Sequence, residues 1–211
     1  MMPGKKNYSL ITYLDIELQK GSKHILNRFN LSVVKGDKLL ISGKSGSGKT
    51  TLFKLLLGFE TPDKGRVLFN EHPVSKAHIV HIRQQIFYLS QDIDLKQGRV
   101  RRVIDEVLDA NKTKEDPGFK KKWMRFLELD EKILEQNIKK LSGGERQRIG
   151  LLLCFLLQRP VWLLDEPTSA LDDKMKEKVS RFIMEQDKTV FIISHEKLWG
   201  NIRRITIGEG N

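Results

Sequence analysis

Residues 43–50 have the composition of a loop that binds phosphate. They read Gly-Lys-Ser-Gly-Ser-Gly-Lys-Thr, which fits the pattern G-x-x-x-x-G-K-[ST]. Small residues allow successive backbone N–H groups to curl around phosphate oxygens, and Lys49 can place its ammonium group near the β- and γ-phosphates. The Thr50 hydroxyl can bind Mg²⁺, and the Thr51 hydroxyl can contact the α-phosphate. The sequence therefore predicts a nucleoside triphosphate site built from Gly43, Lys44, Ser45, Gly46, Ser47, Gly48, Lys49, Thr50 and Thr51.

Two carboxylates directly follow an apolar run. Residues 161–164 are Val-Trp-Leu-Leu, and Asp165 and Glu166 come next. Open α/β sheets bind their ligands at the carboxyl ends of the strands. Asp165 is therefore expected to hold Mg²⁺ through water, and Glu166 to polarise a water molecule for attack on the γ-phosphate. The alternative is an ordinary acidic turn after a strand, which the nearby phosphate loop makes the weaker interpretation.

Two further apolar runs end in polar residues of the kind that phosphate chemistry uses. Gln91 follows the run 86–90, and His195 follows the run 190–194. Taken alone, His195 would be interpreted as a surface or structural histidine. Parallel strands, however, would bring all these ends to one edge of the sheet, so we expect both side chains to join Lys49 and Glu166 in catalysis.

A second helix start has the character of an anion site. Ser142 and Glu145 form the capping-box pattern S-x-x-E, which by itself is common and structural. Gly143 and Gly144 lie between them, although glycine weakens a helix. Glycines expose backbone N–H groups at the positive end of a helix, where phosphate binds readily. One ATP could therefore be sandwiched between the two sites if the second came from another subunit.

The remaining pattern predicts the elements that position these residues. Apolar residues alternate in two N-terminal segments, which predicts half-buried strands; they are Leu14, Ile16 and Leu18, then Phe29, Leu31 and Val33. Continuous apolar runs without alternation, as at 161–164, indicate strands of a parallel sheet that are buried on both faces. Residues 91–141 instead keep helical spacing. The expected fold class is α/β, a P-loop NTPase core with a mostly parallel sheet flanked by helices, N-terminal antiparallel β elements and an inserted helical subdomain. We expect one domain, 1–211, with its core in 1–91 and 158–211 and its helical subdomain in 92–157.

The composition of the chain excludes several classes of protein. The chain has 211 residues, a net charge of +11 and a single cysteine, Cys154, which excludes an internal disulfide framework and a four-cysteine zinc site. The longest apolar run, 151–157, is too short to span a membrane. Acidic residues interrupt the stretch after Lys5 and Lys6, so no signal peptide is predicted and the protein is expected in the cytoplasm. The basic charge is compatible with nucleic acid, a nucleotide or an anionic membrane surface.

The order of these motifs resembles that of the nucleotide-binding subunit of an ABC transporter over nearly the whole chain. The motifs are the phosphate loop, Gln91, LSGGERQR at 141–148, VWLLDEP at 161–167, Ser169-Ala170-Leu171-Asp172 and His195. The resemblance implies that ATP and Mg²⁺ bind, with Thr50, Gln91 and Asp165 at the metal. It also implies that Glu166 is the catalytic base, that His195 is the switch histidine and that Asp172 belongs to a loop that communicates across a dimer.

The same resemblance implies partners. Ser142, Gly143 and Gly144 would contact the γ-phosphate bound to the opposite subunit of a homodimer, and Gln91 would lie in the loop that couples to a multi-span membrane permease. The protein would then associate peripherally with the cytoplasmic membrane. An aromatic residue usually stacks on adenine in this family, but Gln19 and Lys20 occupy that part of this chain.

Two segments, 82–91 and 126–149, are similar to the ATP-binding subunit of bacterial two-component iron-export systems. Iron export is therefore one expectation for the cargo, and no nucleic acid is expected as a partner. The alternatives are an ABC-type ATPase that acts on nucleic acid or ribosomes, and a protein that binds nucleotide without turnover. The charge of +11 favours the first alternative; Asp165, Glu166 and His195 argue against the second.

Overall fold

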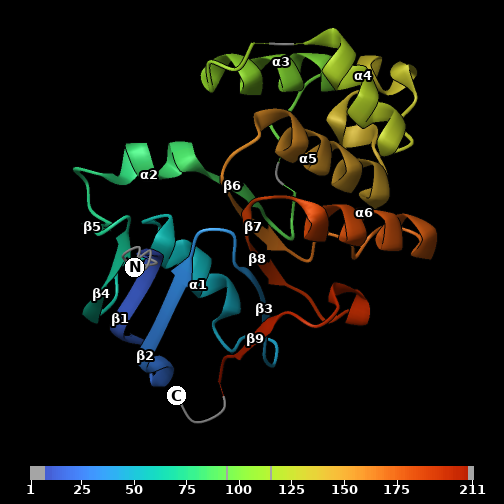
Figure 1. Cartoon of the computed structure of the whole chain (residues 1–211). Helices are drawn as coiled ribbons and strands as arrows, with labels where there is room; N and C mark the ends of the chain where they lie inside the picture. The colour runs from blue at the N-terminus through green and yellow to red at the C-terminus, as the bar shows by residue number, and fades with distance from the viewer. Residues whose placement is uncertain (1–7, 94, 115, 209–211) are drawn as a thin grey trace, which may run out of the picture.

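The structure is a computed structural model that describes residues 8–93, 95–114 and 116–208. Its strands form two sheets (Figure 1). The first is antiparallel, in the order β2-β1-β4-β5, and consists of β1 (Ser9–Lys20), β2 (Lys23–Val34), β4 (Lys64–Phe69) and β5 (His72–Pro73). The N-terminal antiparallel elements that alternation predicts are thus confirmed.

One detail of the predicted alternation in β1 is wrong. Leu14 is 37% exposed, whereas Tyr13 is buried and its hydroxyl donates a hydrogen bond to the Leu52 carbonyl oxygen at 2.8 Å. The register shifts beyond Tyr13 because Asp15 adopts a left-handed conformation with φ 48°. Gly65 on the neighbouring strand permits this bulge, since a Cβ atom there would lie 2.3 Å from the carbonyl oxygens of Leu14 and Asp15.

The second sheet is parallel throughout, in the order β6-β7-β8-β3-β9. Its strands are β3 (Lys38–Ser42), β6 (Ile86–Leu89), β7 (Val161–Asp165), β8 (Thr189–Ile193) and β9 (Arg203–Thr206). Every residue of β7 and β8 is buried, which confirms the prediction of strands covered on both faces. The edge strand β9 was not predicted from the sequence; it pairs with β3.

Helices cover both faces of this sheet (Figure 1). They are α1 (Lys49–Leu56), α2 (Ile79–Gln85), α3 (Val100–Ala110), α4 (Pro117–Phe126), α5 (Gly143–Leu157) and α6 (Asp173–Glu185), with short 3-10 helices at Glu131–Glu135, Ile138–Lys140 and Lys197–Trp199. Successive residues of β7 point to opposite faces. Leu163 packs with α1 and the antiparallel sheet, whereas Trp162 and Leu164 pack with α3 to α6.

Aromatic rings join the helices on the second face. Trp123 of α4 and Phe155 of α5 both meet Phe182 of α6, with ring centroids 4.9 and 4.7 Å apart respectively. Cys154 is fully buried beside them, and burial raises the pKa of its thiol. This packing fixes α5 and α6 against β7, from whose end the catalytic residues are expected to project. No helix in the described part of the chain is long and apolar enough to cross a membrane.

Candidate active site

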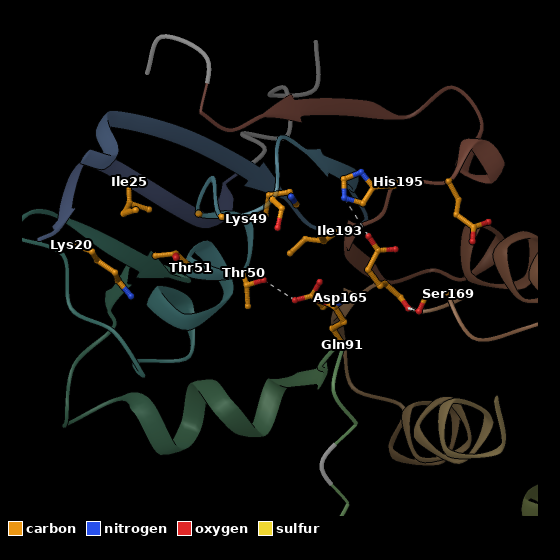
Figure 2. Close-up of a pocket in the computed structure, with 15 residues that line it drawn as sticks. Lys20, Ile25, Lys49, Thr50, Thr51, Gln91, Asp165, Ser169, Ile193 and His195 are labelled. Atoms are coloured by element: carbon orange, nitrogen blue, oxygen red, sulfur yellow. Dashed lines mark hydrogen bonds and ion pairs between the residues drawn. The ribbon is translucent and has the colours of Figure 1, made fainter. Parts of the chain in front are cut away.

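The carboxyl ends of four parallel strands open into one cavity of about 630 Å³. The structure brings most of the predicted residues to its wall: Ser45, Gly46, Gly48, Lys49, Thr50, Thr51, Gln91, Asp165, Glu166 and His195. Figure 2 shows Lys20 and Ile25 at one end, His195 at the other, and Lys49 and Thr50 between them. The predicted convergence of strand ends is therefore present.

The phosphate loop follows β3 directly and leads into α1. Its tight path needs glycine: a Cβ atom on Gly43 would lie 2.4 Å from the Ile207 carbonyl oxygen, and one on Gly48 would lie 2.5 Å from Ile25. The loop residues Gly43, Lys44 and Ser47 do not line the cavity. Positive φ angles of 144°, 70° and 101° at Gly43, Gly46 and Gly48 give the loop the curvature that a phosphate cradle requires.

Two lysines hold this loop. The Lys49 ammonium group donates hydrogen bonds to the carbonyl oxygens of Gly43 at 2.7 Å and Lys44 at 3.0 Å. Lys23, from β2, donates to the Gly46 carbonyl oxygen at 2.8 Å. The Ser47 hydroxyl is buried and has no hydrogen-bond partner among the described residues. Together with the N-terminus of α1, these groups fit a polyphosphate.

Thr50 and Asp165 place two oxygen atoms side by side. The Thr50 hydroxyl donates to Asp165 Oδ2 at 2.8 Å, and Gln91 lies on the same wall. Hydroxyl and carboxylate oxygens are the donors that Mg²⁺ prefers, so these residues fit a magnesium ion bound with phosphate. Burial raises the pKa of Asp165, while the hydrogen bond from Thr50 and the charge of Lys49 lower it.

Asp165→Asn is expected to stabilise the nucleotide-free protein at neutral pH. Because the pKa of Asp165 is higher in the folded state, ionisation of its carboxyl group opposes folding. This penalty is fully present above the raised pKa and disappears below the ordinary carboxyl pKa of about 3.9. The gain in Tm over wild type should therefore shrink as the pH falls from 7 to about 3. Thermal unfolding followed by circular dichroism measures it, with exposed Asp109→Asn as the control; a lower Tm than wild type at pH 7 would contradict this prediction.

Glu166 directly follows the last residue of β7 and has an unusual backbone conformation. Its φ is +49°, and its N–H donates to the Ile193 carbonyl oxygen at 2.8 Å. Its carboxylate lies 3.8 Å from His195 Nε2 and is mostly shielded from solvent, whereas His195 is exposed. Burial raises the pKa of Glu166 more than the charge of His195 lowers it. A carboxylate with a raised pKa accepts a proton more readily, as a general base requires.

The segment that begins α5 does not reach this cavity. Ser142 caps the helix, since its hydroxyl accepts from the Glu145 N–H at 3.2 Å and its own N–H donates to the Glu145 carboxylate at 2.8 Å. This confirms the predicted capping box. Of Ser142, Gly143 and Gly144, only Gly143 lines a second cavity, of about 490 Å³, beside Gln91. The structure thus separates these residues from the phosphate loop of their own chain.

Gly144→Ala is expected to destabilise the protein, and Gly143→Ala is the matched control. A Cβ atom on Gly144 would lie 2.8 Å from the Ala170 carbonyl oxygen, so backbone must move at a cost of about 1–3 kcal/mol. A Cβ atom on Gly143 would lie 3.8 Å from Ala170 Cβ, and alanine there gains up to about 1 kcal/mol of helix propensity. Urea unfolding compares the two variants; equal free energies of unfolding would contradict the close approach.

Several residues of the cavity were not predicted from sequence. Lys20, Ile25, Ile193 and Glu196 line it, and none belongs to a pattern that indicates phosphate chemistry; Ser169, from the motif at 169–172, also lines it, although no contact with the nucleotide was predicted for it. The hairpin between β1 and β2 brings Lys20 and Ile25 there. Gln19 does not line the cavity, and neither do His24, His72, His78 and His81. The described part of its wall contains no Phe, Tyr or Trp ring.

Fold and site together define a P-loop NTPase: a parallel sheet with a glycine-rich phosphate loop after one strand and paired carboxylates after another. Residues 26–169 match the family described as ABC transporter. The chain belongs to this family. It is an ATPase and serves as the ATP-hydrolysing part of a transporter.

Individual relatives agree with this assignment. The chain is 34% identical over 197 residues to the probable iron export ATP-binding protein FetA of Escherichia coli K12, covering 92% of this chain and 88% of that protein. It is 30% identical to a probable ABC transporter ATP-binding/permease protein of Haemophilus influenzae, covering 91% of this chain but only 36% of that protein. In fold it resembles the dimeric ATP-binding cassette MJ0796 bound to ADP and phosphate, with a TM-score of 0.81, 23% identity and 95% coverage of both chains.

Proposed function

We propose that two copies of this chain close head-to-tail on two ATP–Mg²⁺ and thereby drive a separate multi-span membrane permease. The observation that carries this proposal is the separation within one chain: Lys49 and Glu166 line the phosphate cavity, but Ser142 to Gly144 lie elsewhere. A second copy would supply those residues to complete the site. The dimeric state of the solved relative supports the pairing.

In this arrangement the chain's own residues act mainly by electrostatics. Lys49, the loop amides and the opposing Ser142 would stabilise the charge on the transferring phosphoryl group. A magnesium ion held by Thr50 and Asp165, with Gln91 near it, would neutralise the phosphate oxygens. Glu166 would orient a water molecule and accept its proton, while His195 would contact the γ-phosphate from the exposed side of the cavity.

For the cargo we propose a metal ion, iron, moved out of the cell. Support comes from the 34% identity to a probable iron export ATP-binding protein, which extends over 88% of that relative. The relative from Haemophilus influenzae carries ATP-binding and permease functions in one protein, and this chain spans about a third of its length. A separate permease would hold this chain at the cytoplasmic face of the membrane.

Co-purification tests the proposed partner. The Glu166→Gln variant would be purified from detergent-solubilised host membranes with ATP and Mg²⁺, and its companions identified by mass spectrometry. A stoichiometric multi-span membrane protein is expected. Recovery of ribosomes or nucleic acid instead would contradict the permease proposal. It would favour an ATPase that acts on nucleic acid or ribosomes, which the net charge of +11 permits.

A further inference from the structure

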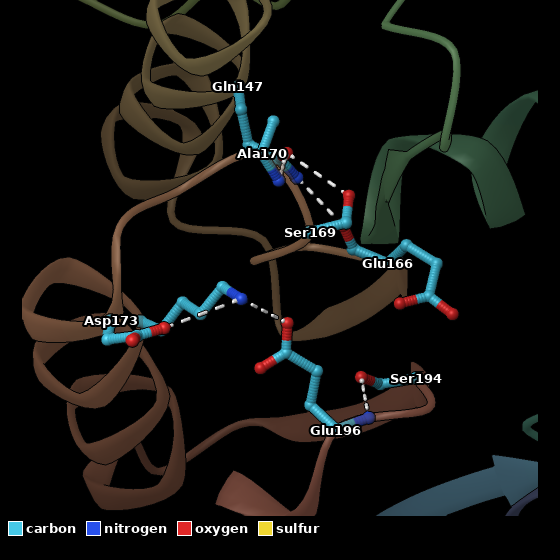
Figure 3. Close-up of polar contacts among 8 residues, drawn as sticks. Gln147, Glu166, Ser169, Ala170, Asp173, Ser194 and Glu196 are labelled. Atoms are coloured by element: carbon cyan, nitrogen blue, oxygen red, sulfur yellow. Dashed lines mark hydrogen bonds and ion pairs between the residues drawn. The ribbon is translucent and has the colours of Figure 1, made fainter.

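A buried glutamine connects α5 to the segment that carries Glu166. Gln147 lies in α5 and is only 3% exposed. Its amide nitrogen donates to the Glu166 carbonyl oxygen at 2.8 Å, and its amide oxygen accepts from the Ala170 N–H at 3.0 Å. Figure 3 shows the side chain reaching from the helix to this loop. Donor and acceptor are both used, so the orientation of the amide is fixed.

The backbone of Glu166, to which Gln147 is hydrogen-bonded, is in a strained conformation. Glu166 has a left-handed backbone with φ +49°, which a residue with a side chain keeps only when its surroundings impose it. On one side its N–H is bound to Ile193. On the other its carbonyl oxygen accepts from the Ser169 N–H at 3.3 Å, from the Ser169 hydroxyl at 3.1 Å and from Gln147. Among the residues that the structure describes, Gln147 is the one partner of that carbonyl oxygen that lies outside the loop beginning at Glu166.

We propose that Gln147 is a positioning residue: it fixes the peptide of Glu166 so that the carboxylate is held in the cavity beside His195. The inference rests on the proposed role of Glu166 as the base. Because Ser142 and Gln147 lie at the start of the same helix, the segment that would contact the partner's nucleotide is joined through one amide to the base of its own chain. Movement of α5 on pairing would therefore be transmitted to Glu166.

Two substitutions separate the hydrogen bond that the amide donates from those that it accepts, which come from the Ala170 N–H and, at 3.5 Å, from the Ser169 hydroxyl. Gln147→Met keeps the length of the side chain and removes all of these hydrogen bonds. Gln147→Glu keeps an acceptor for the Ala170 N–H but removes the donor to the Glu166 carbonyl oxygen. We expect each variant to lower kcat for ATP hydrolysis by about 10- to 100-fold, because small misplacement of a catalytic group has effects of this size. KM for ATP should stay within about twofold of wild type, since the phosphate loop is untouched.

Gln158 provides a matched control at the other end of α5. Its amide donates to the Phe155 carbonyl oxygen at 2.7 Å, remote from the cavity, so Gln158→Met should keep wild-type kcat. Wild-type kcat in Gln147→Glu, or an equal loss of kcat in Gln158→Met, would overturn the inference. The proposed function is judged separately by Glu166→Gln: if that variant turns over ATP like wild type, the assigned base is wrong whatever Gln147 does.

Discussion

Glu166→Gln is expected to lower kcat for ATP hydrolysis by about 100- to 10,000-fold, the range that a general base contributes. The amide has nearly the shape of the carboxylate but cannot accept a proton from water. The carboxylate is well shielded and burial raises its pKa, so it takes up that proton more readily than an ordinary glutamate would. ATP binding should persist, because Lys49 and the loop are intact.

This variant should also pair when ATP and Mg²⁺ are added, since unhydrolysed nucleotide would remain at the proposed interface between the two copies. Release of inorganic phosphate measures kcat, and light scattering with and without ATP measures the association. Glu177→Gln, an exposed site on α6, is the control and should hydrolyse ATP like wild type. Undiminished hydrolysis in Glu166→Gln would remove Glu166 from its proposed role.

Lys49→Ala is expected to weaken ATP binding by about 2–5 kcal/mol, which is about 30- to 5,000-fold in Kd. The substitution removes the cation nearest the expected phosphates. It also releases the carbonyl oxygens of Gly43 and Lys44, which the ammonium group holds in place. Both effects act on the same loop, so of the substitutions proposed for this protein Lys49→Ala should weaken ATP binding the most.

Equilibrium binding of a fluorescent ATP analogue, checked by calorimetry with ATP, gives the Kd. Lys54→Ala is the matched control, because Lys54 lies on α1 as well but is exposed and does not line the cavity. Unchanged affinity in Lys49→Ala would refute the assignment of residues 43–50 as the phosphate loop.

Local chemistry explains which parts of the molecule were predictable. The phosphate loop, Asp165 and Glu166 are each contiguous with the strand that presents them, and strands buried on both faces have an unbroken apolar pattern. Because the strands are parallel, their carboxyl ends share one edge of the sheet. Gln91 and His195 each come just after a strand, so both are placed at the cavity on that edge. Fold class and the position of the cavity could therefore be inferred from sequence alone.

Long-range contacts explain what was missed. Leu14 faces solvent because Asp15 bulges, and the bulge depends on Gly65 in another strand. Lys20 and Ile25 reach the cavity only through the pairing of β1 with β2. Neither feature leaves a periodic or motif signal, because each requires two distant segments to meet.

The bracing of the phosphate loop by Lys23 and Lys49 has a consequence for the speed of the cycle. A loop whose carbonyl oxygens are already held loses little chain entropy when nucleotide arrives. Capture of nucleotide should then approach an encounter-limited rate and need no slow refolding of the loop. If two copies pair as proposed, their association and dissociation would then be slower than the capture of nucleotide.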